Sequence, residues 1–184
     1  MDKDNDQALV EGFRNGDRAA FAALVSRYQQ PIYNAAYRVL GNPDDAADIA
    51  QSVFLRVAEK LDGYDPRFKF FSWLYRIAIN ESIDLLRRNG REAPLEEDEN
   101  MPGADSANPE WQLGEAQLSR RVQGALMGMK ADDRIVITLR HFSECSYREI
   151  GLILDVDEKT VKSRLFEARG RLRGLLKDLQ DTRT

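Results

Sequence analysis

The chain has 184 residues, of which 42% are hydrophobic, and this length and composition allow one medium core or two small ones. It contains no run of roughly eighteen apolar residues and begins with acidic residues, so we expect neither a membrane span nor a signal peptide and assign the chain to the cytoplasm. The single cysteine, Cys145, and the single histidine, His141, exclude an internal disulfide and leave too few ligands for a zinc site, so we expect no metal and no cofactor.

Apolar residues spaced three and four apart predict helices in the first part of the chain. We expect a short helix over about residues 7–15, ended by Gly16, and a second helix capped by Asp17. Pro31 lies inside this second helix and should kink or split it, because proline lacks an amide hydrogen and its ring clashes with the preceding turn. Gly41 should end the helix.

The third predicted helix has a complete set of start signals. Asn42 can cap it, and Pro43 suits its first position. Asp44 and Asp45 then lie against the positive end of the helix dipole. Residues along one face supply its expected core stripe: Ile49, Val53, Val57 and Leu61.

A loop over residues 63–67 precedes a long predicted helix over residues 70–88, which Asn89 and Gly90 close together with the first domain. The start of this helix is rich in aromatic residues, namely Phe68, Phe70, Phe71, Trp73 and Tyr75, and it also carries Arg67, Lys69 and Arg76. One helix face cannot bury five such rings, so we expect most of them in the core and some against a partner. Aromatic rings beside a cationic track are typical of proteins that hold single-stranded nucleic acid.

The composition changes after the first domain. Residues 89–115 contain eight acids and one base, and residues 91–109 have no apolar period, which predicts a flexible acidic linker. Helical spacing then predicts helices over about 110–129 and 132–142, and a pair beginning at Ser146 and Asp157. Since no alternating strand pattern occurs, the predicted fold is all-α, with a helical domain over 1–90, a linker over 91–109 and a second helical domain over 110–184.

The last pair of helices has the length and polarity of a helix-turn-helix. Ser146 and Glu149 can form a capping box, a short turn follows at Asp155, and Gly151 allows the two helices to approach. A basic helix face is usually only a solvated surface, but together with a capped first helix and a tight turn it predicts binding to duplex DNA. The side chains placed to reach bases and phosphates are Lys159, Thr160, Lys162, Ser163, Arg164 and Glu167.

Three segments carry a resemblance to a known family. They are NPDDAADIAQSVFLRV at 42–57, YDPRFKFFSWLYRIAINESIDLLRR at 64–88, and SYREIGLILDVDEKTVKSRLFEARGRL at 146–172. They resemble, in this order, region 2.2, regions 2.3 and 2.4, and region 4 of the extracytoplasmic-function (ECF) sigma factors of bacterial RNA polymerase. The resemblance implies a transcription initiation factor that selects and melts promoters and is not an enzyme.

The resemblance also implies roles for residues of the first domain. The clamp coiled coil of the largest polymerase subunit would bind an outer face that includes Phe54 and Leu55. The residues assigned to this face are Asp44, Asp45, Asp48, Ile49, Gln51, Ser52, Phe54 and Leu55. The aspartates among them are also explained as charges at the N-terminus of the helix. A flipped base of the minus-10 element would be captured, and the duplex melted, by Tyr64, Asp65, Phe68, Lys69, Phe70, Phe71, Trp73, Arg76, Asn80 and Arg87. Asn80 can offer a donor and an acceptor to a base edge, or bond locally within its helix.

For the second domain, the resemblance implies contact with the flap of the second-largest subunit and reading of the minus-35 element by Lys159, Thr160, Lys162, Ser163, Arg164, Phe166, Glu167 and Arg169. Glu167 stands where the family often has a basic residue, and Asp155 replaces a frequent turn glycine, although aspartate tolerates left-handed backbone. The acidic linker is either a tether or a segment that threads polymerase channels. An anti-sigma protein is expected as inhibitor.

Two other classes of function predict different features. A conventional helix-turn-helix regulator, dimerising through its N-terminal helices, predicts tight binding to duplex DNA without polymerase, whereas a sigma factor predicts weak binding when free. An enzyme is disfavoured, because the sequence shows no nucleophile paired with a base and no phosphate-binding glycine loop. His141 and Cys145 lie four residues apart, but two ligands cannot close a zinc site and both residues suit a helix end and its following turn.

Overall fold

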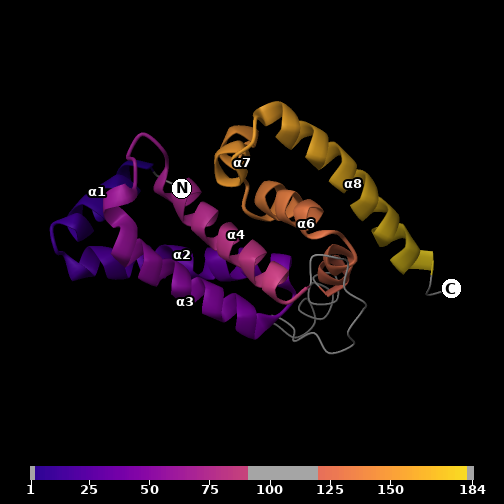
Figure 1. Cartoon of the computed structure of the whole chain (residues 1–184), viewed down its shortest axis with the longest axis horizontal. Helices are drawn as coiled ribbons and strands as arrows, with labels where there is room; N and C mark the ends of the chain where they lie inside the picture. The colour runs from indigo at the N-terminus through magenta and orange to yellow at the C-terminus, as the bar shows by residue number, and fades with distance from the viewer. Residues whose placement is uncertain (1–2, 91–119, 182–184) are drawn as a thin grey trace, which may run out of the picture.

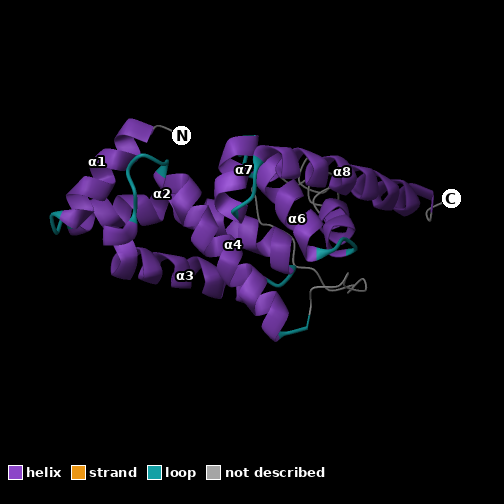
Figure 2. Cartoon of the chain, turned by 45° about the horizontal axis from the view of Figure 1, so that its top comes forward, coloured by secondary structure: helices purple, strands orange, loops and turns teal. Residues whose placement is uncertain are grey.

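The computed structural model describes residues 3–90 and 120–181, and every regular element in these two ranges is helical (Figures 1 and 2). The predicted all-α fold is therefore confirmed. The predicted linker and the first part of the helix predicted over 110–129 lie outside the described residues. Among the described helices, none combines the length and the apolar character that crossing a membrane requires.

The chain begins with α1 (Lys3–Arg14) and α2 (Arg18–Leu40), which are joined by a tight turn. The side chain of Asp17 caps α2 by accepting a hydrogen bond from the amide of Ala19 at 2.8 Å, and Gly41 ends the helix in the left-handed conformation, both as predicted. The prediction that Pro31 splits this helix is wrong, because α2 runs through it without a break. Tyr28 and Ile32, on either side of the proline, are fully buried, and this packing outweighs the hydrogen bond that proline cannot make.

Three further elements complete the first domain: α3 (Pro43–Lys60), the short 3-10 helix η1 (Leu61–Gly63) and α4 (Phe70–Arg88). Asn42 accepts hydrogen bonds from the amides of Asp44 and Asp45, each at 2.9 Å, which confirms the predicted start of α3. The four residues of the predicted core stripe of α3 are all buried. Arg56 and Glu81 form an ion pair that joins α3 to α4.

The second domain contains a helical segment over residues 120–127, α6 (Ala131–Ile137), the π-helical η2 (Thr138–Phe142), α7 (Tyr147–Leu154) and α8 (Glu158–Asp181). Arg134 is fully buried in this domain, where its guanidinium donates to the carbonyls of Met127 at 3.3 Å and Met129 at 3.1 Å. Burial lowers the pKa of Arg134 to about 10. These bonds fasten the turn between the first helical segment and α6.

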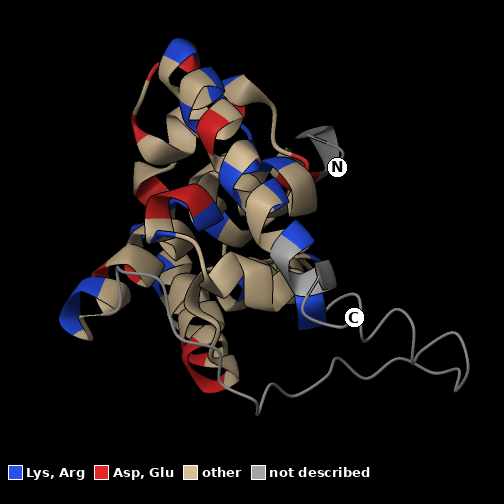
Figure 3. Cartoon of the chain, turned by 90° about the vertical axis from the view of Figure 1, so that its right-hand side faces the viewer, with Lys and Arg blue, Asp and Glu red and all other residues tan. Residues whose placement is uncertain are grey.

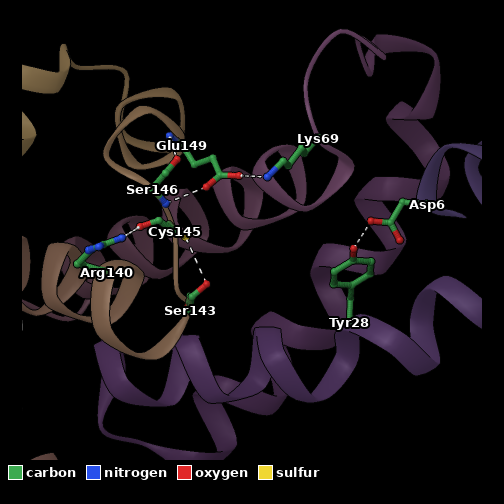
Figure 4. A network of polar contacts seen from close by, with 8 residues as sticks. All are labelled: Asp6, Tyr28, Lys69, Arg140, Ser143, Cys145, Ser146 and Glu149. Carbon is green, nitrogen blue, oxygen red and sulfur yellow. Dashed lines mark hydrogen bonds and ion pairs between the residues drawn. The ribbon is translucent and has the colours of Figure 1, made fainter. Parts of the chain in front are cut away.

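The two domains contact each other, mainly through α4 and α7, which lie side by side (Figure 1). Lys69 and Glu149 form an ion pair at 2.7 Å between the loop before α4 and the first turn of α7 (Figure 4). The guanidinium of Arg38 lies 3.9 Å from the centre of the Phe142 ring, a cation–π contact between α2 and η2. The interface thus brings part of the predicted minus-10 surface against the predicted helix-turn-helix.

Candidate nucleic-acid interface

A pocket of about 310 Å³ lies where the loop after η1 meets the first turns of α4. Tyr64 forms its inner wall and is held by the rings of Phe70 and Trp73, whose centroids both lie 5.5 Å from its own. Phe68 lies at the rim and is 38% exposed. The pocket is lined by Gly63, Tyr64, Asp65, Phe68, Ser72, Trp73, Arg76 and, from α7, Leu152. Such an opening, with rings on several sides and an arginine beside it, has the chemistry to hold a flat aromatic ligand.

Hydrogen bonds within the loop maintain its shape. The Tyr64 hydroxyl donates to the carbonyl of Phe68 at 2.7 Å, and Asp65 accepts from both the backbone and the guanidinium of Arg67. These bonds from Arg67 hold the pKa of Asp65 below its ordinary value. Burial, together with the nearby carboxylate of Asp6, raises the pKa of Tyr64, so its hydroxyl stays protonated and remains a donor at neutral pH.

The predicted minus-10 residues occupy two different environments. Phe70 and Phe71 are packed in the core, as is Tyr75, so in this structure they support α4 and do not present a free ring. Arg76 and Asn80 are exposed one turn apart, in the same direction from the helix as the half-buried Trp73. The buried residues of α4 include those at 70, 71, 74, 75 and 78, which recur with a helical period. The predicted residues with accessible surface are Phe68 and Lys69, which precede α4, and Trp73, Arg76, Asn80 and Arg87 on it.

The predicted polymerase-binding residues of α3 also separate into two groups. Ile49 and Phe54 are buried, and Phe54 makes an edge contact with Phe21 at 6.5 Å, so the expectation that Phe54 lies on an outer face is wrong. Leu55 is 67% exposed and is the apolar member of that face. The exposed residues follow spacings of four, three and four and therefore form one stripe along α3: Asp44, Asp48, Gln51 and Leu55. Asp45 and Ser52 flank this stripe and are half-buried.

The helix-turn-helix has the predicted local geometry. The Ser146 hydroxyl accepts from the amide of Glu149 at 3.2 Å, and the carboxylate of Glu149 accepts from the amide of Ser146 at 2.8 Å, which completes the capping box (Figure 4). Asp155 ends α7 in the left-handed conformation, with a φ of 55°. Gly151 is required by close packing, since a Cβ atom there would lie 2.7 Å from the carbonyl oxygen of Val156.

The outer face of α8 carries the predicted minus-35 residues. Figure 3 shows Lys and Arg in blue and Asp and Glu in red over the helices of both domains. Val161, Leu165 and Ala168 are buried against the rest of the domain, and the opposite face is open to solvent. Phe166 is 81% exposed, more than any other large hydrophobic residue in the described part of the chain. The exposed residues on this face are Lys159, Lys162, Ser163, Arg164, Phe166 and Glu167, with Thr160 at its edge.

Two arginines of α8 bind within the domain. Arg169 donates from its Nε to the Nε2 of His141 at 3.1 Å, which requires that ring nitrogen to be unprotonated. Burial first, and then the positive charges of Arg169 and Arg140, lower the pKa of His141. Arg171 bonds to Asp133 at 2.7 Å and to Glu167 at 3.0 Å. No local pattern in the sequence indicates the pairing of Asp133 or His141 with α8, since both contacts join residues far apart in the chain.

Cys145 is fully buried beneath the capping box of α7, and burial raises the pKa of its thiol to about 12. Its carbonyl accepts a hydrogen bond from Arg140 at 2.8 Å (Figure 4). Within residues 3–90 and 120–181, no group of three or more histidine, cysteine, aspartate or glutamate residues is arranged to hold a metal ion. In this domain Cys145 is packed in the core, and His141 accepts a hydrogen bond from Arg169.

The family model for Sigma-70 region 2 matches residues 24–92, and the model for Sigma-70, region 4, matches residues 119–172. The chain is 37% identical over 181 residues to the ECF RNA polymerase sigma factor SigW of Bacillus subtilis (strain 168), a match that covers 92% of this chain and 96% of that protein. It is 35% identical over 173 residues to the ECF RNA polymerase sigma-E factor of Escherichia coli (strain K12), which covers 89% and 90% of the two chains.

Two solved structures have a similar fold. CnrH in complex with the cytosolic domain of CnrY is similar with a TM-score of 0.71 and 25% identity, covering 95% of this chain and 98% of that one. The sigma factor RpoE in complex with the anti-sigma factor NepR from Bartonella quintana is similar with a TM-score of 0.69 and 26% identity, covering 85% and 96%. Both matches cover more of the chain than either domain alone.

Proposed function

This chain belongs to the ECF family of RNA polymerase sigma factors, and from that premise we propose how its two domains divide the work of promoter recognition. It is an alternative sigma factor, which binds core polymerase and recognises the minus-10 and minus-35 elements. We place the domain boundaries at 1–90 and 110–184, joined by the acidic linker. The protein acts in the cytoplasm, where polymerase transcribes, and it catalyses no covalent step of its own.

The stripe on α3 is the proposed docking surface for the clamp coiled coil of polymerase. An exposed leucine among acidic and amide side chains, with Leu55 67% exposed, fits an interface that has a small apolar centre and a polar rim. We expect Leu55→Ser to weaken binding to core polymerase, and Lys60→Ser, an exposed change on the opposite side of α3, to leave it intact. Equal binding of the two variants in a pull-down would reject this surface.

The pocket between the loop and α4 is the observation that carries the proposed role in promoter opening. Flipping a base out of the duplex costs a few kcal/mol, and stacking on an aromatic ring returns about 1–3 kcal/mol per base. Phe68 and Trp73 line the pocket and offer rings for stacking. Asn80, exposed two turns after Trp73 and outside the pocket lining, offers an amide to a base edge of the same strand. The exposed Arg76 would neutralise a phosphate of the same strand.

In this structure, α7 covers part of that pocket. Leu152 contributes to its lining, and Glu149 of α7 pairs with Lys69, the residue that follows Phe68 in the loop. The two promoter elements also lie much farther apart on DNA than two helices in contact. We therefore propose that α7 moves away from α4 when polymerase binds the two domains, and that the second domain then contacts the flap of the second-largest subunit.

Loss of the Asn80 amide tests the proposed contact of α4 with the minus-10 element. Asn80→Ala should impair promoter opening, followed by permanganate reactivity of unpaired thymines, more than it impairs binding to polymerase. Asn34→Ala, an exposed asparagine on α2, is the matched control and should open promoters normally. Equal losses of opening and polymerase binding for Asn80→Ala would count against its assignment to the minus-10 element.

The exposed face of α8 is the proposed reader of the minus-35 element. Lys162→Ala combined with Arg164→Ala should reduce protection of the upstream element in a footprint of the holoenzyme. Removing the same charge farther along α8, with Arg173→Ala and Lys177→Ala, should reduce it less. Strong protection by the protein without polymerase would instead favour the dimeric regulator.

An anti-sigma protein is the proposed inhibitor. One similar structure is named as a sigma factor in complex with an anti-sigma factor, and the other as a complex with the cytosolic domain of CnrY. Because both matches span the two domains, an inhibitor that binds across them would hold the pocket and α7 together. Co-purification with such a partner, and loss of holoenzyme when it is added, test this proposal.

A further inference from the structure

The loop over residues 61–69 needs support from outside itself if the pocket is to keep its shape. Its own bonds, such as those from Tyr64 to Phe68 and from Arg67 to Asp65, join residues no more than five positions apart. Such bonds fix the internal shape of a loop but not its position relative to the helices. Leu61 and Tyr64 are buried at the start of the loop, whereas the side chains of Asp65, Arg67 and Phe68 have substantial exposed surface, so the position of the loop depends on how its buried start is held.

Arg14, the last residue of α1, supplies a contact from outside the loop. Its Nη2 donates to the carbonyl of Leu61 at 3.0 Å and to the carbonyl of Tyr64 at 2.9 Å, across 47 and 50 positions of the chain. Its guanidinium carbon also lies 5.9 Å from the centre of the Tyr64 ring. The Arg14 side chain therefore bonds the loop at two backbone carbonyls, three residues apart, and also contacts the Tyr64 ring in the wall of the pocket.

The helix that carries Arg14 is itself firmly placed. Asp6 of α1 is buried and forms an ion pair with Arg27 at 2.5 Å and a hydrogen bond with the hydroxyl of Tyr28 (Figure 4). Tyr28 in turn makes an edge contact at 5.9 Å with Phe70, the first residue of α4. The start of α1 is thus tied to α2 and α4, and Arg14 extends this rigid frame to the loop.

We infer that Arg14 is a positioning residue for capture of the minus-10 base. It holds the loop in the geometry that accepts the base before DNA arrives, so that the loop loses less conformational entropy when the strand binds. An arginine suits this task because one terminal nitrogen bonds both carbonyls while the planar group lies near the ring. The inference rests on the proposed function of the pocket, and it assigns Arg14 no contact with DNA.

The test uses the full chain assembled with core polymerase. Arg14→Met keeps most of the apolar stem and removes the donors, and Arg18→Met, an exposed arginine four residues later, removes the same charge as a matched control. The measured quantity is the affinity of the holoenzyme for a single-stranded oligonucleotide that carries the non-template minus-10 sequence. We expect roughly tenfold weaker binding for Arg14→Met, the scale of one charge-assisted hydrogen bond, and unchanged binding for Arg18→Met.

Salt dependence separates positioning from a direct contact with phosphate. Loss of a phosphate contact reduces the slope of log affinity against log salt by about one, whereas loss of positioning lowers the affinity at every salt concentration and leaves the slope unchanged. Unchanged affinity or a reduced slope for Arg14→Met would overturn the inference. Arg14→Lys, which keeps the charge and one donor nitrogen, should restore part of the affinity, and it carries the test if Arg14→Met does not fold.

Phe68→Ala in the same assay distinguishes the two levels of the argument. If Phe68→Ala binds the oligonucleotide as tightly as the unchanged protein, the proposed function of the pocket fails. If Phe68→Ala binds weakly and Arg14→Met binds normally, the pocket stands and only the role of Arg14 is rejected.

Discussion

Glu149 has two roles, and two substitutions can separate them. Its carboxylate caps α7 by accepting from the amide of Ser146, and it also pairs with Lys69 of the first domain (Figure 4). Glu149→Gln keeps an oxygen for the cap, because glutamine also serves in a capping box, but removes the charge that attracts Lys69. Glu149→Ala removes both interactions. The difference in free energy of unfolding between the two variants therefore measures the contribution of the cap. The decrease in free energy of unfolding in Glu149→Gln measures the contribution of the contact between the domains.

The magnitudes follow from the exposure of the groups. The Lys69 side chain is 51% exposed and that of Glu149 is 14% exposed, so their ion pair is partly screened and should contribute about 0.2–1 kcal/mol. Loss of a helix N-terminal cap costs about 0.5–2 kcal/mol. We expect the free energy of unfolding to fall by about 0.5 kcal/mol in Glu149→Gln and by about 1–2 kcal/mol in Glu149→Ala.

Urea denaturation of the full chain measures both changes, and pH provides a second test. Burial, the largest influence, raises the pKa of Glu149, but the hydrogen bonds from Lys69 and Ser146 together outweigh it and leave the pKa below its ordinary value of 4.5. A lowered pKa in the folded state means that the ionised group stabilises the protein above pH 4.5 and that this contribution is lost as the pH falls below it. The wild type should therefore lose its advantage over Glu149→Gln in that acidic range. Equal stability of Glu149→Gln and Glu149→Ala would refute the role of the cap, and an advantage over Glu149→Gln that persists in acid would refute the role of the charge.

Four other predictions follow from the packing. Gly151→Ala should lower the free energy of unfolding by about 1–3 kcal/mol in urea titrations, because the added methyl meets the rigid backbone carbonyl of Val156; a neutral result would show that the turn can shift. Asn42→Ala should cost about 1 kcal/mol in the same titration, since two backbone amides of α3 lose their acceptor, whereas Asn42→Asp should cost little. Leu74→Ala, at a position with no exposed surface, should cost about 2–5 kcal/mol, and a loss near zero would contradict its place in the core. Cys145 should react slowly with a thiol reagent at pH 8 and rapidly in urea, because it is buried and its pKa is about 12; equal rates would contradict that burial.

Features set by neighbouring residues were predictable from the sequence. The cap at Asn42 and the capping box at Ser146 each involve residues within three positions, so the sequence contains all the information that decides them. The left-handed turn at Asp155 follows from the tolerance of aspartate for that conformation. The order of helices and the presence of a helix-turn-helix were confirmed for the same reason.

Features set by distant residues were not predictable. Pro31 carries a strong signal to break a helix, but burial of the helix on both sides of it overrides that signal. Arginine is usually found at the protein surface. Arg134 nevertheless lies in the core, because two backbone carbonyls are placed to accept hydrogen bonds from its guanidinium. The choice between Phe54 and Leu55 as the exposed member of α3 depends on Phe21, more than thirty residues earlier. The support that Arg14 gives to the pocket belongs to the same class.

The contacts between the two domains are of a kind that larger partners can replace. The ion pair of Lys69 with Glu149 is half-exposed on one side, and the cation–π contact of Arg38 lies against a ring, Phe142, that is itself 39% exposed. Partly exposed contacts of either type contribute about 1 kcal/mol or less. Gln123 also donates to the carbonyl of Tyr37 at 3.0 Å, and Met127 lies against Gly41, so polymerase surfaces that bind each domain separately must replace these contacts as well. The proposed movement of α7 away from α4 therefore requires that binding of the two domains to separate polymerase surfaces outweigh all of these contacts together.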